Sequence, residues 1–231
     1  MIAYFIKFLL HNLPALLFIV ALLIAATKRV PRSGAERFLS WILLLPIGVT
    51  GVWAGAFHVF FPTVSAKLIG WQVSPFQFEV GMADLAIGVT ACVSFWRDLD
   101  FKAAAVSVSS IFLLGDAVGH VQQMLIAGNF APGNAGVPFY MDIICPLLSI
   151  ALLAIATRQK SLVQNSWIML KNSKNCFSRP NCSDLGIKVS SDVNSLIVAK
   201  AVYVLEIGPR RDFFNTIHEF CNELSSTLER S

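Results

Sequence analysis

Seven ionisable side chains lie inside apolar stretches of the sequence, where a charged group is costly and therefore usually functional. They are His11, His58, Glu79, Asp84, Asp116, His120 and Asp142. Imidazole and carboxylate groups are the ligands used for Zn, Mn or non-haem Fe, and chains of such groups also carry protons. The residues that we expect to share one site are His58, Glu79, His120 and Asp142.

The spacing around His120 indicates how that histidine would be oriented. Asp116 is four residues before His120, so both lie on one face if the segment is helical. Gln123 is seven residues after Asp116 and extends that face. Asp116 would then act as the hydrogen-bond partner that orients a ligating histidine. The polar and aromatic residues expected around the site are Asp116, Gln123, Asn129, Asn134 and Trp71.

The first hypothesis for this cluster is a cofactor site, either for a divalent metal or for haem. Two imidazoles and two carboxylates would supply nitrogen and oxygen ligands to a metal. In the haem alternative, His58 and His120 are the axial ligands, and the helices must leave an apolar slot between them. The sequence contains neither an HExxH nor a CxxCH motif, so no spacing identifies the cofactor.

Two other hypotheses use the same residues without a cofactor. The second is a small ion or solute transporter or a proton relay, which needs polar groups in both halves of the spans. Candidates for the inner half are Ser107, Ser109, Ser110 and Thr90. The third hypothesis is a membrane scaffold in which Glu79 or Asp142 pairs with the histidines and fixes the helix register.

Composition places these residues in a membrane protein. The chain has 231 residues, of which 55% are hydrophobic and 14% charged, against about 25% charged residues in a soluble domain. Five apolar stretches are long enough to span a bilayer with about 20 residues each: 3–27, 38–61, 78–96, 102–127 and 138–157. In lipid each must be helical, so the predicted fold is an all-α bundle of about five transmembrane helices over residues 1–157.

The distribution of basic residues predicts the orientation of the bundle. Cations gather between the first two stretches, between the third and fourth, and after the fifth. By the positive-inside rule, the C-terminus is cytoplasmic and the N-terminus is outside. In the first stretch the basic group follows the apolar run, so we expect a retained helix and not a cleaved signal peptide. The ionisable side chains then lie mainly in the outer half of the bundle.

Two pairs of glycines predict close helix contacts. Gly51 and Gly55 form a GxxxG pattern in the second span, and Gly115 and Gly119 form another in the fourth. Small residues at this spacing let helix backbones approach closely. We therefore expect the helices that carry His58 and His120 to be neighbours.

Residues 158–231 have a different character and form a predicted cytosolic tail that is partly disordered. Within it, 195–207 is β-branched and resembles a strand, and 211–230 has the spacing of an amphipathic helix. The tail is a candidate surface for a protein partner, and the chain is a candidate homo-oligomer. The five cysteines match no disulfide framework or zinc pattern, so we expect free thiols.

Several function classes lack any supporting motif. No serine or cysteine has a recognisable nucleophile context, and the chain has neither a Walker motif nor GxGxxG. The tail has no basic cluster suited to nucleic acid. The expected partners are therefore the lipid bilayer and proteins, and not nucleic acid.

Residues 58–146 contain a set of motifs that resembles an uncharacterised family of small bacterial multi-pass membrane proteins. The motifs are His58–Pro62, Ile69–Trp71, Ser74–Gly81, Gly115–His120 and Asn129–Gly136, followed by Asp142. The resemblance implies a bacterial inner-membrane location but supplies no reaction. Asp84 stands where Asn is expected in this family, so it is left out of the four-residue cluster.

Overall fold

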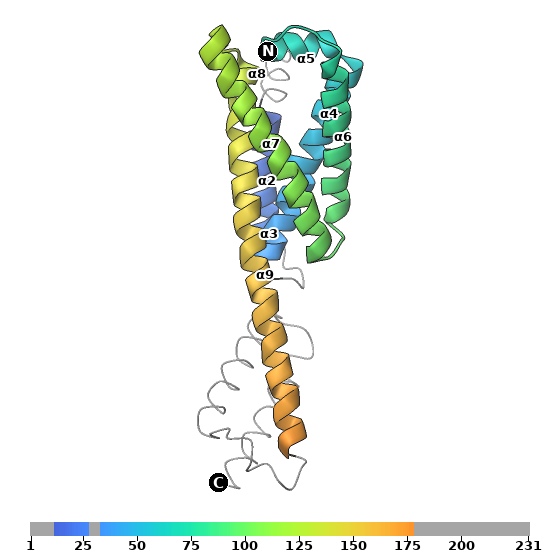
Figure 1. The fold of residues 1–231 in the computed structure, drawn as a ribbon, viewed down its shortest axis with the longest axis vertical. Helices are drawn as coiled ribbons and strands as arrows, with labels where there is room; N and C mark the ends of the chain where they lie inside the picture. Colours follow the sequence, from blue (N-terminus) through green and yellow to red (C-terminus); the bar gives the residue numbers. More distant parts are fainter. Residues whose placement is uncertain (1–11, 28–32, 178–231) are drawn as a thin grey trace. The chain divides into compact units, whose positions relative to one another are not determined.

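The computed structural model describes residues 12–27 and 33–177, and every regular element in these ranges is a helix. The elements in Figure 1 are α2 (Leu13–Thr27), α3 (Gly34–Ile42), the π-helix η1 (Leu43–Val49), α4 (Thr50–Phe60), α5 (Pro62–Ile69), α6 (Phe76–Ser94), α7 (Leu99–Ala127), α8 (Pro132–Ala135) and α9 (Val137–Phe177). The predicted all-α helical bundle is confirmed.

Among the described residues, four helices are long and apolar enough to cross a membrane. They are Gly34–Phe60, which joins α3, η1 and α4, then Phe76–Ser94, Leu99–Ala127 and Pro132–Ser166. They correspond to the second to fifth predicted spans. The predicted first span, 3–27, is seen as the apolar helix α2 of 15 residues, and its earlier part lies outside the described residues.

Local signals explain where the helices begin and end. The side chain of Asp98 accepts a hydrogen bond from the backbone N–H of Phe101 at 3.0 Å, so α7 begins at Leu99, three residues before the predicted boundary. At its other end α7 stops at Gly128, whose φ of 61° is left-handed. A glycine adopts this conformation without a steric penalty, which makes it a common helix terminator.

The π-helix η1 interrupts the second span, which the sequence predicts as one uniform helix. It contains Pro46, which has no backbone N–H and whose ring crowds the preceding helical turn. A π turn is wider than an α turn, so it accommodates the proline and the chain continues as α4.

The contacts divide the chain into two units, each described by itself. Unit 1 contains residues 1–30 and 34–157, and unit 2 contains 31–33 and 158–231.

Helix α9 continues to Phe177, well past the predicted end of the last span at 157, because no Pro or Gly interrupts residues 158–177. The predicted strand 195–207 and helix 211–230 lie outside the described residues.

Helices α4 and α6 approach each other at backbone distance through glycines on both helices. A Cβ added to Gly88 would lie 2.5 Å from the backbone nitrogen of Val52, and one added to Gly55 would lie 2.6 Å from the carbonyl oxygen of Gly81. No side chain larger than hydrogen fits there without moving backbone. The expected role of Gly51 and Gly55 in close packing is therefore confirmed.

The second span, which carries His58, contacts α7 through η1 and not through its glycines. Gly51 and Gly55 pack against α6 and not against α7, because Gly81 and Gly88 on α6 supply the complementary small surface. The second motif does not make a helix contact in the described residues, since a Cβ added to Gly115 or Gly119 would meet nothing within 4 Å. Helix α7 packs on α6, α8 and η1.

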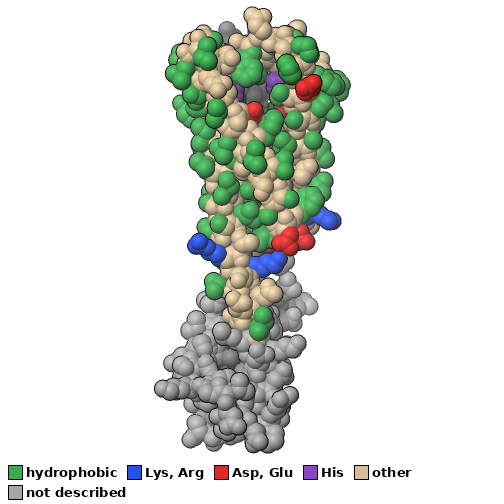
Figure 2. All heavy atoms as spheres, in the orientation of Figure 1, with side chains coloured by type: hydrophobic (Ala, Val, Ile, Leu, Met, Phe, Trp, Pro, Cys, Tyr) green, Lys and Arg blue, Asp and Glu red, His purple; other side chains and the backbone are tan. Residues whose placement is uncertain are grey.

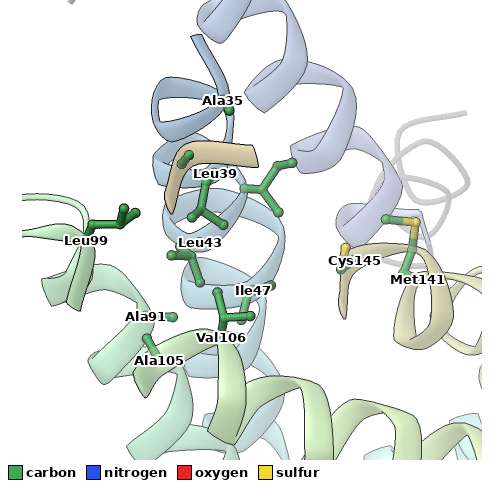
Figure 3. Close-up of a cluster of buried hydrophobic side chains, with 12 residues drawn as sticks. Ala35, Leu39, Leu43, Ile47, Ala91, Leu99, Ala105, Val106, Met141 and Cys145 are labelled. Atoms are coloured by element: carbon green, nitrogen blue, oxygen red, sulfur yellow. The ribbon is translucent and has the colours of Figure 1, made fainter. Parts of the chain in front are cut away.

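A cluster of buried apolar side chains joins α3, η1, α6, α7 and α9, and Figure 3 shows part of it. Leu39, Leu43 and Val106 are among its most buried members. Beside it, the fully buried Lys102 pairs with Glu36, with Nζ 3.4 Å from Oε1, and donates to the carbonyl of Arg97. This ion pair ties the α6–α7 connection to α3.

On the visible face of unit 1, charged and uncharged side chains occupy different parts of its length. Figure 2 shows a broad hydrophobic and uncharged region between two ends that carry charged or histidine side chains. Arg97, Asp98 and Asp100 are exposed where α6 connects to α7. An apolar middle between polar ends is the surface expected for a bundle in a bilayer.

Replacing Gly88 by alanine tests the α4–α6 contact. The new methyl group meets backbone atoms of Val52 and Gly51, so Gly88→Ala is expected to lower the free energy of unfolding by about 1–3 kcal/mol. The measurement is reversible unfolding of the full chain in detergent micelles. The matched control is Gly119→Ala, which meets no atom and is expected to be neutral or stabilising by up to about 1 kcal/mol. Equal effects of the two substitutions would contradict the close packing.

Candidate functional site

Asn134 in α8 is the centre of a hydrogen-bond network and is fully buried. Its Oδ1 accepts a hydrogen bond from Trp71 Nε1 at 3.0 Å and lies 2.8 Å from His120 Nδ1. Its Nδ2 donates to the carbonyl oxygens of His120 at 3.2 Å and Asn129 at 2.9 Å. All the hydrogen-bonding positions of the amide are therefore used.

A second asparagine fixes the loop that carries Asn134. Asn129 Nδ2 donates to the carbonyl oxygens of Ile69 at 2.9 Å and Gly70 at 3.3 Å, at the end of α5. A Cβ added to Gly133 would lie 2.7 Å from the carbonyl oxygen of Leu68, so α8 rests directly on the α5 backbone. The two loops that flank α5 and α8 thus form one layer over this end of α7.

His120 in α7 joins this layer to α9. Its Nε2 lies 3.5 Å from Oδ2 of Asp142, and its ring is next to those of Trp71 and Phe139, with centroid distances of 5.9 and 6.3 Å. The loop after α5 and the helices α8, α7 and α9 therefore meet through Trp71, Asn134, His120 and Asp142, in that order. We call these four residues the polar network.

Three carboxylates from three helices interact with one another, and one of them, Asp142, belongs to the polar network; we call the three the interior carboxylates. Asp142 on α9 is close enough to interact electrostatically with Asp116 on α7 and with Asp84 on α6, and Asp84 also interacts with Asp116. All three are partly buried. Within the part of the chain that the structure describes, their one ion-pair contact is His120–Asp142, and none has a Lys or Arg partner. Figure 2 shows acidic and histidine side chains in a hollow at this end of unit 1.

Helices α4, α7 and α9 each carry one buried hydroxyl group that has no hydrogen-bond partner among the described residues. These groups are Thr50 Oγ1 on α4, Ser110 Oγ on α7 and Ser149 Oγ on α9. Ser110 is ten residues from His120 and Ser149 is seven from Asp142, which places them roughly 15 and 10 Å along their helices. Unsatisfied buried hydroxyls are rare in proteins and call for a ligand or water.

Of the four hydroxyl residues that the sequence indicated for the inner half, only Ser110 has a buried, unpartnered oxygen. Ser107, Ser109 and Thr90 donate back to carbonyls of their own helices, as hydroxyls in apolar helices commonly do. Thr50 and Ser149 were missed, although Ser149 is the single serine within residues 138–157.

Of the four residues that the sequence predicts to share one site, the structure brings two into contact. His120 and Asp142 are brought together. His58 on α4 is partly buried against Gly81, and its Nδ1 has no partner among the described residues. Glu79 is exposed in the first turn of α6.

The surrounding residues expected from the sequence divide in the same way. Trp71, Asn129 and Asn134 make the contacts described above. Asp116 lies with the interior carboxylates. Gln123 is partly buried, and its carbonyl accepts from the backbone N–H groups of Gly128 and Asn129 at the end of α7.

A metal centre gains no support from this arrangement. In residues 12–27 and 33–177, no three His, Cys, Asp or Glu side chains are grouped as ligands of one ion would be. Binding by three or four protein ligands is the usual requirement for a stable zinc site. The metal and haem sites therefore stay hypotheses, and Cys92 and Cys145 are free thiols.

Comparison with known proteins gives one match. Residues 11–162 match the model of a family described as "Family of unknown function (DUF6790)". The comparisons with curated proteins and with solved structures give no match.

Replacing Asn134 by leucine tests whether the amide holds the two loops together. Asn134→Leu keeps a similar volume but leaves the Trp71 and His120 N–H groups without their acceptor. Each buried group without a partner costs about 1–3 kcal/mol, so unfolding in detergent is expected at a clearly lower denaturant concentration. The control is Gln122→Leu at an exposed amide of α7, expected to change stability by no more than about 0.5 kcal/mol. A neutral Asn134→Leu would show that the network does not organise this end.

Proposed function

Because the chain belongs to the Family of unknown function (DUF6790), whose description gives no activity, we propose a function from the geometry of the site: a membrane protein that moves protons or another small cation through its bundle. The interior carboxylates attract the cation, and His120 and Asp142 bind it at the end covered by α5 and α8. The buried hydroxyls of Thr50, Ser110 and Ser149 continue the path towards the other end.

The observation that carries the proposal is the set of three interior carboxylates, none of which has a Lys or Arg partner among the described residues. Asp84, Asp116 and Asp142 come from three helices and interact with one another. A bare carboxylate in an apolar interior is very costly, so it must be protonated, hydrated or paired with a cation. Because the three interact, ionising one of them disfavours ionisation of the others, so the set takes up protons or another cation. Ionisable groups inside a bundle commonly mark ion paths.

The buried hydroxyls provide the second support, because a path needs polar groups at more than one depth. A buried hydroxyl without a partner costs about 1–3 kcal/mol, and a scaffold gains nothing from that cost. Ser110 and Ser149 are at least nine-tenths buried, and both occur on the helices that also carry Asp116, His120 and Asp142. Water or a passing cation would satisfy them.

The orientation of the bundle completes the proposal. The basic residues near the α6–α7 connection and after residue 157 favour the cytoplasmic side, so the polar network faces outside. We propose the bacterial inner membrane as its location, because residues 58–146 resemble small bacterial membrane proteins. The tail from residue 158 then lies in the cytoplasm, where it can bind a protein partner.

The scaffold is the second candidate function, and the saturated amide of Asn134 favours it. An amide with four hydrogen bonds fixes the arrangement of helices and loops whether or not an ion passes. The two functions differ in the interior carboxylates, which a scaffold does not need.

Proton flux into liposomes tests the proposed function. The full chain is reconstituted with a pH-sensitive dye inside, and a potassium gradient with valinomycin drives uptake. With the wild type we expect the liposome interior to become acidic. For Asp142→Asn we expect the rate of proton uptake to fall about tenfold or more, and a tenfold change corresponds to about 1.4 kcal/mol in free energy. The control is Asp100→Asn, which removes an exposed carboxylate at the other end and should leave flux unchanged. No flux of protons, Na⁺ or K⁺ with the wild type would reject transport and favour the scaffold.

Ser149→Ala separates a path from a structural role at the buried hydroxyls. Removing an unsatisfied hydroxyl is expected to leave the protein equally stable or more stable. The same change is expected to reduce cation flux several-fold, because a polar step of the path is lost. Unfolding and flux are measured on the same preparation. Unchanged flux with raised stability would exclude Ser149 from the path.

A further inference from the structure

We propose that His120 and Asp142 form a binding site for a single proton, which is held between His120 Nε2 and Asp142 Oδ2. Asn134 and Trp71 act as positioning residues that fix which histidine nitrogen faces the carboxylate. The inference rests on the proposed function for its role in transport and names the proton as the bound ion. The hydrogen bonds that support it can be tested without measuring transport.

The orientation of the Asn134 amide is set by three partners whose roles are unambiguous. The carbonyl oxygens of His120 and Asn129 can only accept, so the group facing them is the NH₂. The indole nitrogen of Trp71 can only donate, so the group facing it is the oxygen. A flipped amide would lose all three hydrogen bonds.

This orientation fixes the tautomer of His120. Its Nδ1 lies 2.8 Å from the Asn134 oxygen, a normal hydrogen-bond distance, so Nδ1 must carry a hydrogen. In a neutral imidazole the other nitrogen is then an acceptor. Nε2 therefore presents a lone pair to Asp142 unless it takes up a second proton.

The contact between His120 and Asp142 is stable only with one proton in it. If the imidazole is neutral and the carboxylate is ionised, two lone pairs face each other at 3.5 Å. A proton on either group removes this repulsion, giving an imidazolium with a carboxylate or an imidazole with a carboxylic acid. Both forms have zero net charge, which suits an apolar interior.

The surrounding charges also favour one proton. Besides His120, the titratable groups that interact with Asp142 among the described residues are Asp116 from α7, Asp84 from α6 and Cys145 on α9 itself. Loss of the proton would leave a net charge of −1 beside these two carboxyl groups. Uptake changes the charge of the pair from −1 to 0, with no other bond formed or broken. Transfer of this proton from the pair to Asp116 or Asp84 would link the pair to the rest of the proposed path.

Counting the protons on both partners in one sample is the direct test. The full chain in lipid nanodiscs is labelled with ¹⁵N-histidine and ¹³C-aspartate, and ring-nitrogen and carboxyl signals are recorded by NMR. Signals are assigned through their loss in His120→Gln and Asp142→Asn. At neutral pH we expect a protonated Nδ1 and one further proton on either Nε2 or the Asp142 carboxyl. A neutral His120 facing an ionised Asp142, two further protons, or hydrogen on Nε2 alone would each overturn the proposal.

Two variants test the role of Asn134 and the link to function. Asn134→Leu is expected to give a mixture of His120 tautomers, whereas His58→Gln is the matched control and leaves the His120 signals unchanged. If Asn134→Leu does not fold, Asp142→Asn is the alternative test, because the intact Asn134 amide should keep the hydrogen on His120 Nδ1 in that variant.

A single proton with no flux would retain the binding site and reject transport. A different proton count rejects the site even if flux is present.

Discussion

The saturated amide of Asn134 is the constraint on which the candidate site depends. Its four hydrogen bonds reach the loop after α5, the end of α7 and the loop before α8. The last two segments follow one another in the sequence, but the loop after α5 is distant, with Trp71 63 positions before Asn134. An apolar residue at this position would leave donors and acceptors unpaired in a buried place, so the geometry of His120 depends on this side chain.

The apolar part of the bundle has a complementary role. Gly55 and Gly81 bring α4 and α6 together at backbone distance, and Lys102 ties the α6–α7 connection to α3 through Glu36. Gly81 is three residues before Asp84 on α6, so the close α4–α6 contact lies beside one of the three carboxylates. A site that holds charge in an apolar interior requires such rigid support, since a looser bundle would let the carboxylates turn outwards to water.

Much of the fold and part of the site were predictable from the sequence. The length of the apolar stretches predicts the membrane spans. The presence of ionisable side chains within those stretches identifies Asp116, His120 and Asp142 as site residues. Helical spacing alone does not identify the partner of each face: Gly51 and Gly55 meet Gly81 and Gly88 of α6, while the contact of the same span with α7 is at η1. Glu79 also has the right type and depth but points outwards, because position along a helix does not fix the direction of a side chain at a helix start. The contacts of Asn134 depend on loops, whose paths no periodicity predicts.

The π-helix η1 has a consequence for everything that follows it in the second span. Successive residues of an α-helix are rotated by about 100°, and a π turn holds one more residue than an α turn would. The helix therefore leaves η1 with its faces turned by about one residue's rotation relative to an unbroken helix. Pro46 thus sets the angular phase of α4. Gly51, Gly55 and His58 share that phase, so the same wide turn that accommodates a proline also decides which side of the helix meets α6.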